Sequence, residues 1–200
     1  MPFLQGFYIC TMAENNKKKK GRRAYLDDFQ TTVSGEMIYC GAYYVYQGAA
    51  GARKGFLMKV TASAAAAAVF AVLSGCVPAP GTLNSFYVLL PLLGSILSAI
   101  SVLWGVIRLI AGGEKLREYV YSASVEELPL RTALCIGCAG LSILGELLHL
   151  ILNGTGGKLL GIVLFLLAQG IVLVSSLFCR RTAATAVWKR LDSGKGKKTD

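Results

Sequence analysis

Residues 86–111 read FYVLLPLLGSILSAISVLWGVIRLIA, with Arg108 as the one charged side chain. A helix rises about 1.5 Å per residue, so this stretch is long enough to cross a hydrocarbon core of about 30 Å. In lipid an unpaired backbone amide or carbonyl costs several kcal/mol, and a helix pairs these groups within one segment. The stretch therefore predicts a transmembrane helix.

Three further stretches are similarly apolar and lie at residues 57–77, 130–152 and 159–178. The whole chain of 200 residues is 54% hydrophobic and 16% charged, which is too apolar for a soluble domain of this size. We therefore expect an all-α polytopic membrane protein. Its domains would be a cytoplasmic N-terminal segment at 1–55, a four-helix transmembrane bundle at 56–182 and a basic cytoplasmic tail at 183–200.

The lysines and arginines indicate how this bundle is oriented. Twenty of the 21 lie at or before Lys59, between Arg108 and Arg131, or from Arg180 onward. The connection at 78–85 has no charge, and the one at 153–158 has a single lysine. Because cytoplasmic loops carry an excess of Lys and Arg, we expect both turns to face outward and both termini to be cytoplasmic, in a bacterial cytoplasmic membrane. This topology explains the net charge of +10, so no nucleic-acid partner is expected.

Basic segments next to a membrane attract anionic headgroups, with each Lys or Arg contributing about 1 kcal/mol. The residues expected to make such contacts are Lys17, Lys18, Lys19, Lys20, Arg22, Arg23, Arg180, Arg181, Lys189 and Arg190. The dense charge at 13–23 predicts a solvated tail. Residues 1–10 lack the features of a signal peptide, and translation is expected to start at Met1 or at Met12, which opens a more ordinary beginning.

The rest of the N-terminal segment contains weaker local signals. Tyr25, Phe29 and Val33 recur every four residues and predict a short amphipathic helix from about Ala24 to Gly35. Aromatic and β-branched residues on both sides of a Gly-Ala pair then predict a tight β-hairpin at 36–47. A glycine-rich joint at 48–55 would lead into the first span.

Two more segments lie on the predicted cytoplasmic side. Residues 114–121 are expected to continue the second helix, and Ser124 with Glu127 has the spacing of a capping box for the third, with Pro129 in its first turn. After the fourth span, residues 180–191 combine apolar and basic side chains and predict a basic amphipathic extension that contains Trp188.

Small residues predict how the first two spans pack, because small side chains let helices in lipid approach closely. The first span has a stripe of Ser63, Ala67, Ala71 and Gly75. The second presents Pro91, Gly94, Ser98, Ser101, Gly105 and Arg108 within about 100° of arc. We expect these two faces to form a close helical hairpin.

The third span carries the candidate polar site. Cys135, Cys138, Ser142, Glu146 and His149 lie within about 80° of arc on a helical wheel. Glu146 and His149 are the one acidic residue and the one histidine within the spans, and an ionisable group inside a bilayer is a functional candidate. Gln169 and Ser176 of the fourth span are expected as hydrogen-bond partners.

Several functions are compatible with this stripe. We favour a non-enzymatic accessory or scaffolding subunit, in which Glu146 and His149 pair with each other or with Gln169 to hold helices together. Its partners would be anionic lipid and a membrane protein or a second copy of the chain. One alternative is a small proton-coupled transporter in which Glu146 takes up a proton and His149 relays it. A second alternative is a membrane thiol oxidoreductase using Cys135 and Cys138.

Metal and cofactor chemistry are not expected. Glu-x-x-His is used in di-iron bundles, but those sites need carboxylates from other helices, which the other spans lack. The chain also has no phosphate-binding glycine loop and no extramembrane Ser/His/Asp set.

Overall fold

The structure is a computed structural model, and it describes residues 29–31, 37–39, 41–48, 51–154 and 157–191. Its long helices are α2 (Ala52–Cys76), α4 (Phe86–Ala111), α6 (Leu128–Asn153) and α7 (Leu159–Ala184). Each belongs to a helical segment long and apolar enough to cross a membrane. The predicted all-α four-helix bundle is confirmed, and this is the architecture of a multi-pass membrane protein.

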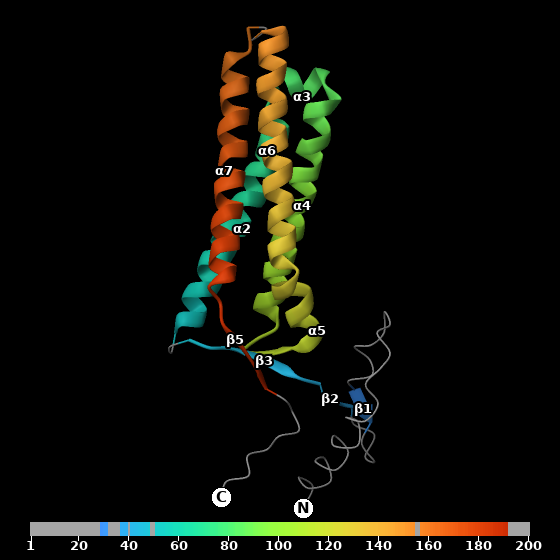
Figure 1. Cartoon of the computed structure of the whole chain (residues 1–200), viewed down its shortest axis with the longest axis vertical. Coiled ribbons are helices and arrows are strands. Elements are labelled where there is room, and N and C mark those ends of the chain that lie inside the picture. The colour runs from blue at the N-terminus through green and yellow to red at the C-terminus, as the bar shows by residue number, and fades with distance from the viewer. Residues whose placement is uncertain (1–28, 32–36, 40, 49–50, 155–156, 192–200) are drawn as a thin grey trace, which may run out of the picture.

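The four helices form a ring in which α2 and α6 are diagonal to one another (Figure 1). Each of these two helices packs on both α4 and α7. The middle of the bundle is built from small side chains: Ala68, Ala71, Ala99, Cys135, Ala139 and Val172. Such residues let the helix backbones approach closely, which is how helices associate in lipid without a hydrophobic drive between them.

The predicted close hairpin of the first two spans is only part of this arrangement. Ser63, Ala67 and Ala71 of α2 are buried, but Gly75 is exposed. Helix α2 contacts α4, yet it packs more extensively on α7, while α4 packs most extensively on α6. The small residues therefore serve a ring of four helices rather than one pair.

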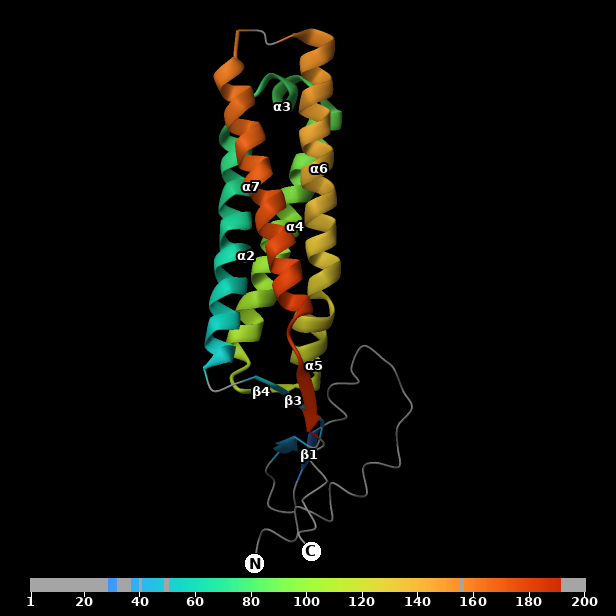
Figure 2. The ribbon, with the colours of Figure 1, turned by 60° about the vertical axis from the view of Figure 1, so that its left-hand side comes forward.

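The two ends of the bundle differ (Figure 2). At the end that we name the α3 end, the short helix α3 (Pro80–Asn84) connects α2 to α4. At the opposite end, the sheet end, three strands form an antiparallel sheet in the order β4-β3-β5. These strands are β3 (Tyr43–Tyr46), β4 (Lys115–Arg117) and β5 (Trp188–Leu191). The sheet therefore joins segments from three distant parts of the chain.

Aromatic side chains attach this sheet to the bundle. Tyr44 stacks on Tyr121 with ring centroids 3.9 Å apart, and Tyr46 contacts Phe56 at 5.4 Å and Trp188 at 5.5 Å. Leu116 of β4 is fully buried in the same cluster. Since an isolated hairpin is marginal in water, this packing explains how such short strands persist.

The prediction of a short helix followed by a local β-hairpin within residues 24–47 is wrong. Phe29–Thr31 is strand β1 rather than helix, and it pairs with β2 (Met37–Tyr39); residues 24–28 and 32–36 lie outside the described part. Strand β3 pairs with β4 and β5 instead of folding back on β2. Both neighbours of β3 are brought to it by the bundle, which a local turn signal does not reveal.

The predicted continuation of the second helix through 114–121 is also wrong. Helix α4 ends at Ala111, and Gly113 has a φ of 69°, in the left-handed region that favours glycine. A Cβ on Gly112 would overlap Leu116 Cδ2. The glycine pair therefore lets the chain turn back and bury Leu116 in β4.

The local structure before α6 differs from the predicted capping box. Residues Glu118–Tyr121 form the short helix α5 and Ser122–Glu126 a π-helical turn, η3, and no side chain caps the start of α6. Glu127 instead pairs with Arg131 at 2.5 Å. Pro129 lies in the first turn of α6, as predicted.

The predicted basic amphipathic extension after the fourth span is replaced by two elements. Helix α7 continues to Ala184, and residues Trp188–Leu191 form strand β5. Val45 of β3 pairs with Lys189, and Tyr46 pairs with Trp188. The segment is extended because β3 offers it a hydrogen-bonding edge and an aromatic partner.

Candidate functional site

The polar stripe predicted on the third span lies inside the bundle. Ser142 and Glu146 have no exposed surface, and His149 is almost fully buried. All three belong to the half of α6 that leads to the α3 end (Figure 1). Membrane-embedded polar groups normally face the bundle interior, because lipid offers them no hydrogen bonds.

Glu146 is bound by the connection between α2 and α4. Its Oε1 accepts a hydrogen bond from the backbone N–H of Gly81 at 3.3 Å. This amide lies in the first turn of α3, where N–H groups have no partner within the helix and favour a negatively charged neighbour. The carboxyl group of Glu146 therefore caps α3 from another helix.

The close approach depends on residue 81 being glycine. A Cβ at this position would overlap the Glu146 carboxylate, and it would also lie 3.2 Å from Val88 Cγ2. Gly145, the residue before Glu146, is also tightly packed, since its Cβ would lie 3.2 Å from the Tyr87 carbonyl oxygen. Two glycines thus let α3 and α4 approach α6 around Glu146.

His149 is bound mainly by groups from the start of α4. Its Nδ1 lies 2.9 Å from Ser85 Oγ, 3.2 Å from Tyr87 Oη and 3.3 Å from Asn153 Nδ2. His149 therefore fastens the start of α4 to α6.

Glu146 and His149 do not make the contacts that we expected between themselves and with Gln169. Within the described part of the chain, no hydrogen bond joins Glu146 to either residue. Gln169 Nε2 donates to Ser74 Oγ at 2.7 Å, and Gln169 Oε1 accepts from Ser95 Oγ at 3.4 Å. Gln169 thus joins α2, α4 and α7 in a separate network.

Two polar atoms near Glu146 have no partner among the described residues. They are Glu146 Oε2 and Ser142 Oγ, which lie one helical turn apart on α6. Leaving a buried polar atom unpaired costs about 1–3 kcal/mol. Such an atom in a native structure calls for an explanation, such as a bound ion or water.

The two candidate redox cysteines are free thiols on the interior side of α6. Cys135 is fully buried, and its Sγ accepts a hydrogen bond from Ser176 Oγ at 3.3 Å. Cys138 packs against Gly94, where a Cβ would lie 2.9 Å from its Sγ. Both thiols serve as small packing groups between helices in this arrangement.

The basic residues predicted to contact lipid headgroups divide into two sets. Lys17 to Lys20, Arg22 and Arg23 lie outside the described part of the chain. Arg180, Arg181, Lys189 and Arg190 are exposed and lie at the sheet end, in or just beyond the last turns of α7.

Sequence reasoning missed the contribution of the connection before α4. Gly81, Ser85 and Tyr87 supply the groups that bind Glu146 and His149. One signal was available, because Pro80-Gly81 places a proline at the first position of a helix within a turn that has no charge. That signal predicts a short helix but not what it contacts.

Among the described residues, no three His, Cys, Asp or Glu side chains gather as a metal site would require.

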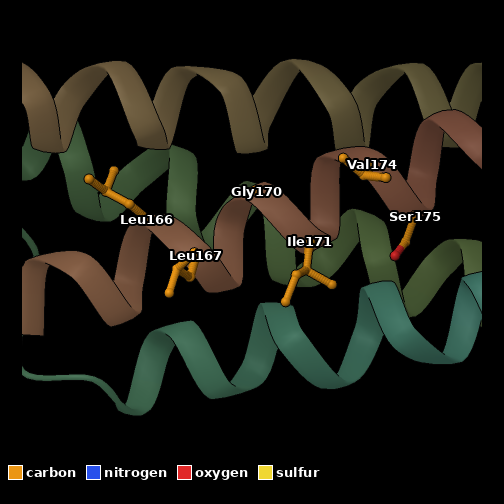
Figure 3. A pocket seen from close by; sticks show the side chains of 6 residues that line it. All are labelled: Leu166, Leu167, Gly170, Ile171, Val174 and Ser175. Carbon is orange, nitrogen blue, oxygen red and sulfur yellow. The ribbon is translucent and has the colours of Figure 1, made fainter.

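A groove of about 350 Å³ follows the surface of α7 and is lined by Leu166, Leu167, Gly170, Ile171, Val174 and Ser175 (Figure 3). Leu167, Ile171 and Val174 are exposed apolar side chains, as expected for a surface that meets acyl chains.

Comparison with models of protein families, with curated proteins and with solved structures finds no match for this chain.

Proposed function

We propose that the chain is a non-enzymatic accessory or scaffolding subunit of a cytoplasmic membrane. In this role the bundle supplies a rigid surface in the membrane, and its activity consists of packing against a partner. The partner is another membrane protein or a second copy of the chain.

The contact between Glu146 and Gly81 is the observation that carries this proposal. Glu146 is the one acidic residue within the spans, and its carboxyl group ties α3 to α6. His149 and Gln169 likewise make contacts between helices or with a connection. Glu146, His149 and Gln169 thus each have a structural use that requires no substrate.

The charge distribution supports an orientation with the sheet end in the cytoplasm. Lys115, Arg117 and Lys189 lie in the sheet, and Arg180 and Arg181 lie in the last turns of α7. The described part of the α3 end contains Lys158 as its one basic side chain. The bias of Lys and Arg toward the cytoplasm favours this arrangement, and anionic headgroups are the matching lipid partner.

A proton-coupled transporter is the second candidate, and one specific observation favours it. Glu146 Oε2 is buried and has no partner among the residues that the structure describes, and His149 lies one turn closer to the α3 end. A proton entering from that end would meet His149 before Glu146, in the order that a relay requires. The thiol oxidoreductase stays a prediction: Cys135 contacts Ser176 of α7 and Ser95 of α4, and Cys138 contacts Gly94 of α4.

Purified protein in sealed vesicles distinguishes the two candidates. The variant is Glu146→Gln, and the control is Glu127→Gln, which changes a half-exposed glutamate just before α6. An accessory subunit should carry no proton flux above empty vesicles, and Glu146→Gln should lower the yield and thermal stability of the bundle. A transporter should carry a pH-dependent flux that Glu146→Gln abolishes and Glu127→Gln retains. Unchanged flux together with unchanged yield would contradict both candidates.

The redox alternative has its own test. Thiols are alkylated in intact cells with and without prior reduction, and the modified peptides are measured by mass spectrometry. We expect Cys135 and Cys138 to give the same result under both conditions, since both are free thiols. Reduction that newly exposes either thiol would support the oxidoreductase instead.

A further inference from the structure

Two fully buried oxygens on α6 lack a hydrogen-bond partner in the described part of the chain. Glu146 Oε2 and Ser142 Oγ lie on successive turns of the same helix, on its interior side. A carboxylate oxygen only accepts, and a hydroxyl oxygen has two lone pairs for acceptance. Both oxygens therefore have free lone pairs for acceptance, and the Ser142 hydroxyl also has an unused proton.

Helix α4 adds a third acceptor at the same level. Pro91 lies inside α4 and has no N–H, so the carbonyl of Tyr87, four residues earlier, has lost its usual donor. This carbonyl faces α6, since a Cβ on Gly145 would lie 3.2 Å from its oxygen. Gly145 directly precedes Glu146, and Ser142 lies one helical turn before Glu146 in α6.

Contacts of Val88 and Gly81 connect the region around Glu146 to α3. Val88 Cγ2 lies 3.2 Å from the position that a Cβ would take on Gly81 and equally far from that position on Gly145. Gly81 in turn contacts the Glu146 carboxylate. The Glu146 carboxylate and the Tyr87 carbonyl therefore lie where α3, α4 and α6 meet, and Ser142 lies one turn of α6 further from the α3 end. Figures 1 and 2 show these three helices together at that end.

We propose that Glu146 Oε2, Ser142 Oγ and the Tyr87 carbonyl bind a small monovalent cation, with Na⁺ as the ligand. Hard cations take oxygen ligands, and a single carboxylate balances a single positive charge inside a bilayer. Ca²⁺ takes six to eight oxygens and Mg²⁺ keeps several waters, so both fit a region with one carboxylate poorly. The site goes beyond the accessory role, since a bound ion would stabilise the bundle whether or not it transports anything.

Thermal unfolding of the full chain in detergent tests this site. Protein is measured in NaCl and in choline chloride at equal ionic strength, because choline is too large for the site. A ligand that binds only the folded state stabilises it by RT ln(1 + [L]/Kd). Na⁺ at ten times its Kd should therefore raise Tm by roughly 3–6 °C in the wild type.

Variants separate this site from a general salt effect. Glu127→Gln should keep the full response to Na⁺, whereas Ser142→Ala should reduce it and Glu146→Gln should abolish it. If Glu146→Gln fails to fold, the effect of Na⁺ on the Tm of Ser142→Ala decides whether the site binds Na⁺. A second measurement uses a hydrophobic carbodiimide, which modifies carboxyl groups in lipid; Na⁺ should slow the labelling of Glu146 at least several-fold compared with choline.

Three results would overturn the proposal. The first is an equal Tm in NaCl and choline chloride for the wild type, which indicates bound water alone. The second is a Na⁺ response that Ser142→Ala and Glu146→Gln retain in full. The third is labelling of Glu146 that depends on pH but not on Na⁺, which identifies a proton as the occupant.

Discussion

Gly81 donates its backbone N–H to Glu146 Oε1 at 3.3 Å, across 65 positions of sequence, and the carboxylate occupies the space that a side chain at residue 81 would fill. A short connecting helix and a transmembrane helix are thereby joined through one glycine. This contact leads to the first prediction.

Gly81→Ala should destabilise the protein by about 1–3 kcal/mol, which is the usual cost of adding a methyl group to a packed interior. The added Cβ would overlap the Glu146 carboxylate and displace it from the Gly81 amide. Unfolding in detergent measures the change. The matched control is Gly137→Ala on α6, where a Cβ meets no atom within 4 Å and the substitution should stabilise the helix by about 0.5–1 kcal/mol. Equal effects of the two substitutions would show that Gly81 is not in contact with Glu146.

Gln169→Leu should cost a small amount of stability and should be coupled to Ser74. Its amide nitrogen donates to Ser74 Oγ at 2.7 Å, inside a region where neither group meets water. Interhelical hydrogen bonds in membranes average about 0.6 kcal/mol and reach about 1.7 kcal/mol. A double-mutant cycle with Ser74→Ala should give a coupling energy in this range. The same cycle with Ser175→Ala, at a partly buried position facing the surface groove, should give none.

Two substitutions at Trp188 should change the free energy of unfolding by different amounts. Its ring contacts Tyr46 at 5.5 Å and Tyr121 at 5.8 Å, while its Nε1 is buried without a partner among the described residues. Trp188→Phe removes the unpaired N–H and keeps a ring, so the free energy of unfolding should change by less than about 0.5 kcal/mol. Trp188→Ala removes the ring and should cost about 2 kcal/mol, less than for a fully buried tryptophan.

The readout for Trp188 is the free energy of unfolding together with protease sensitivity at the sheet end. Loss of the ring should also loosen β5 and expose the chain after Ala184 to protease. If both substitutions cost the same, the aromatic contacts do not hold the sheet.

The features that sequence reasoning predicted correctly are those with a local cause. Residues 86–111 were predicted as a span, and α4 has these bounds, because hydropathy and length alone decide whether a helix crosses lipid. The wheel placed Ser142 and Glu146 on one face of α6, and both are buried. Each inference needed only neighbouring residues.

The features that it missed depend on residues far apart in the chain. Tyr44 and Arg190 pair across the sheet although they lie at opposite ends of the sequence. Glu146 takes its hydrogen bond from Gly81 rather than from His149, three residues away on its own helix. The turn signal at Gly41 predicted a local pairing because it contains no information about which strands the bundle brings together.

The α3 end of the bundle should lie outside the cell and the sheet end in the cytoplasm. Reporter fusions after Asn84 and after Lys158 should lie outside the cell, and fusions after Arg117 and after Leu191 should lie in the cytoplasm. Arg117 and Leu191 both pair with Tyr43 in the sheet, so they must lie on the same side. The positive-inside bias then selects the cytoplasm for this side.

These fusions separate two kinds of error. If all four report the reverse sides, the bundle stands but its orientation is inverted, and the basic residues at the sheet end do not control insertion. If Arg117 and Leu191 report opposite sides, no three-stranded sheet can form. The four helices would then not all cross the membrane, and the region around Glu146 would not lie within lipid.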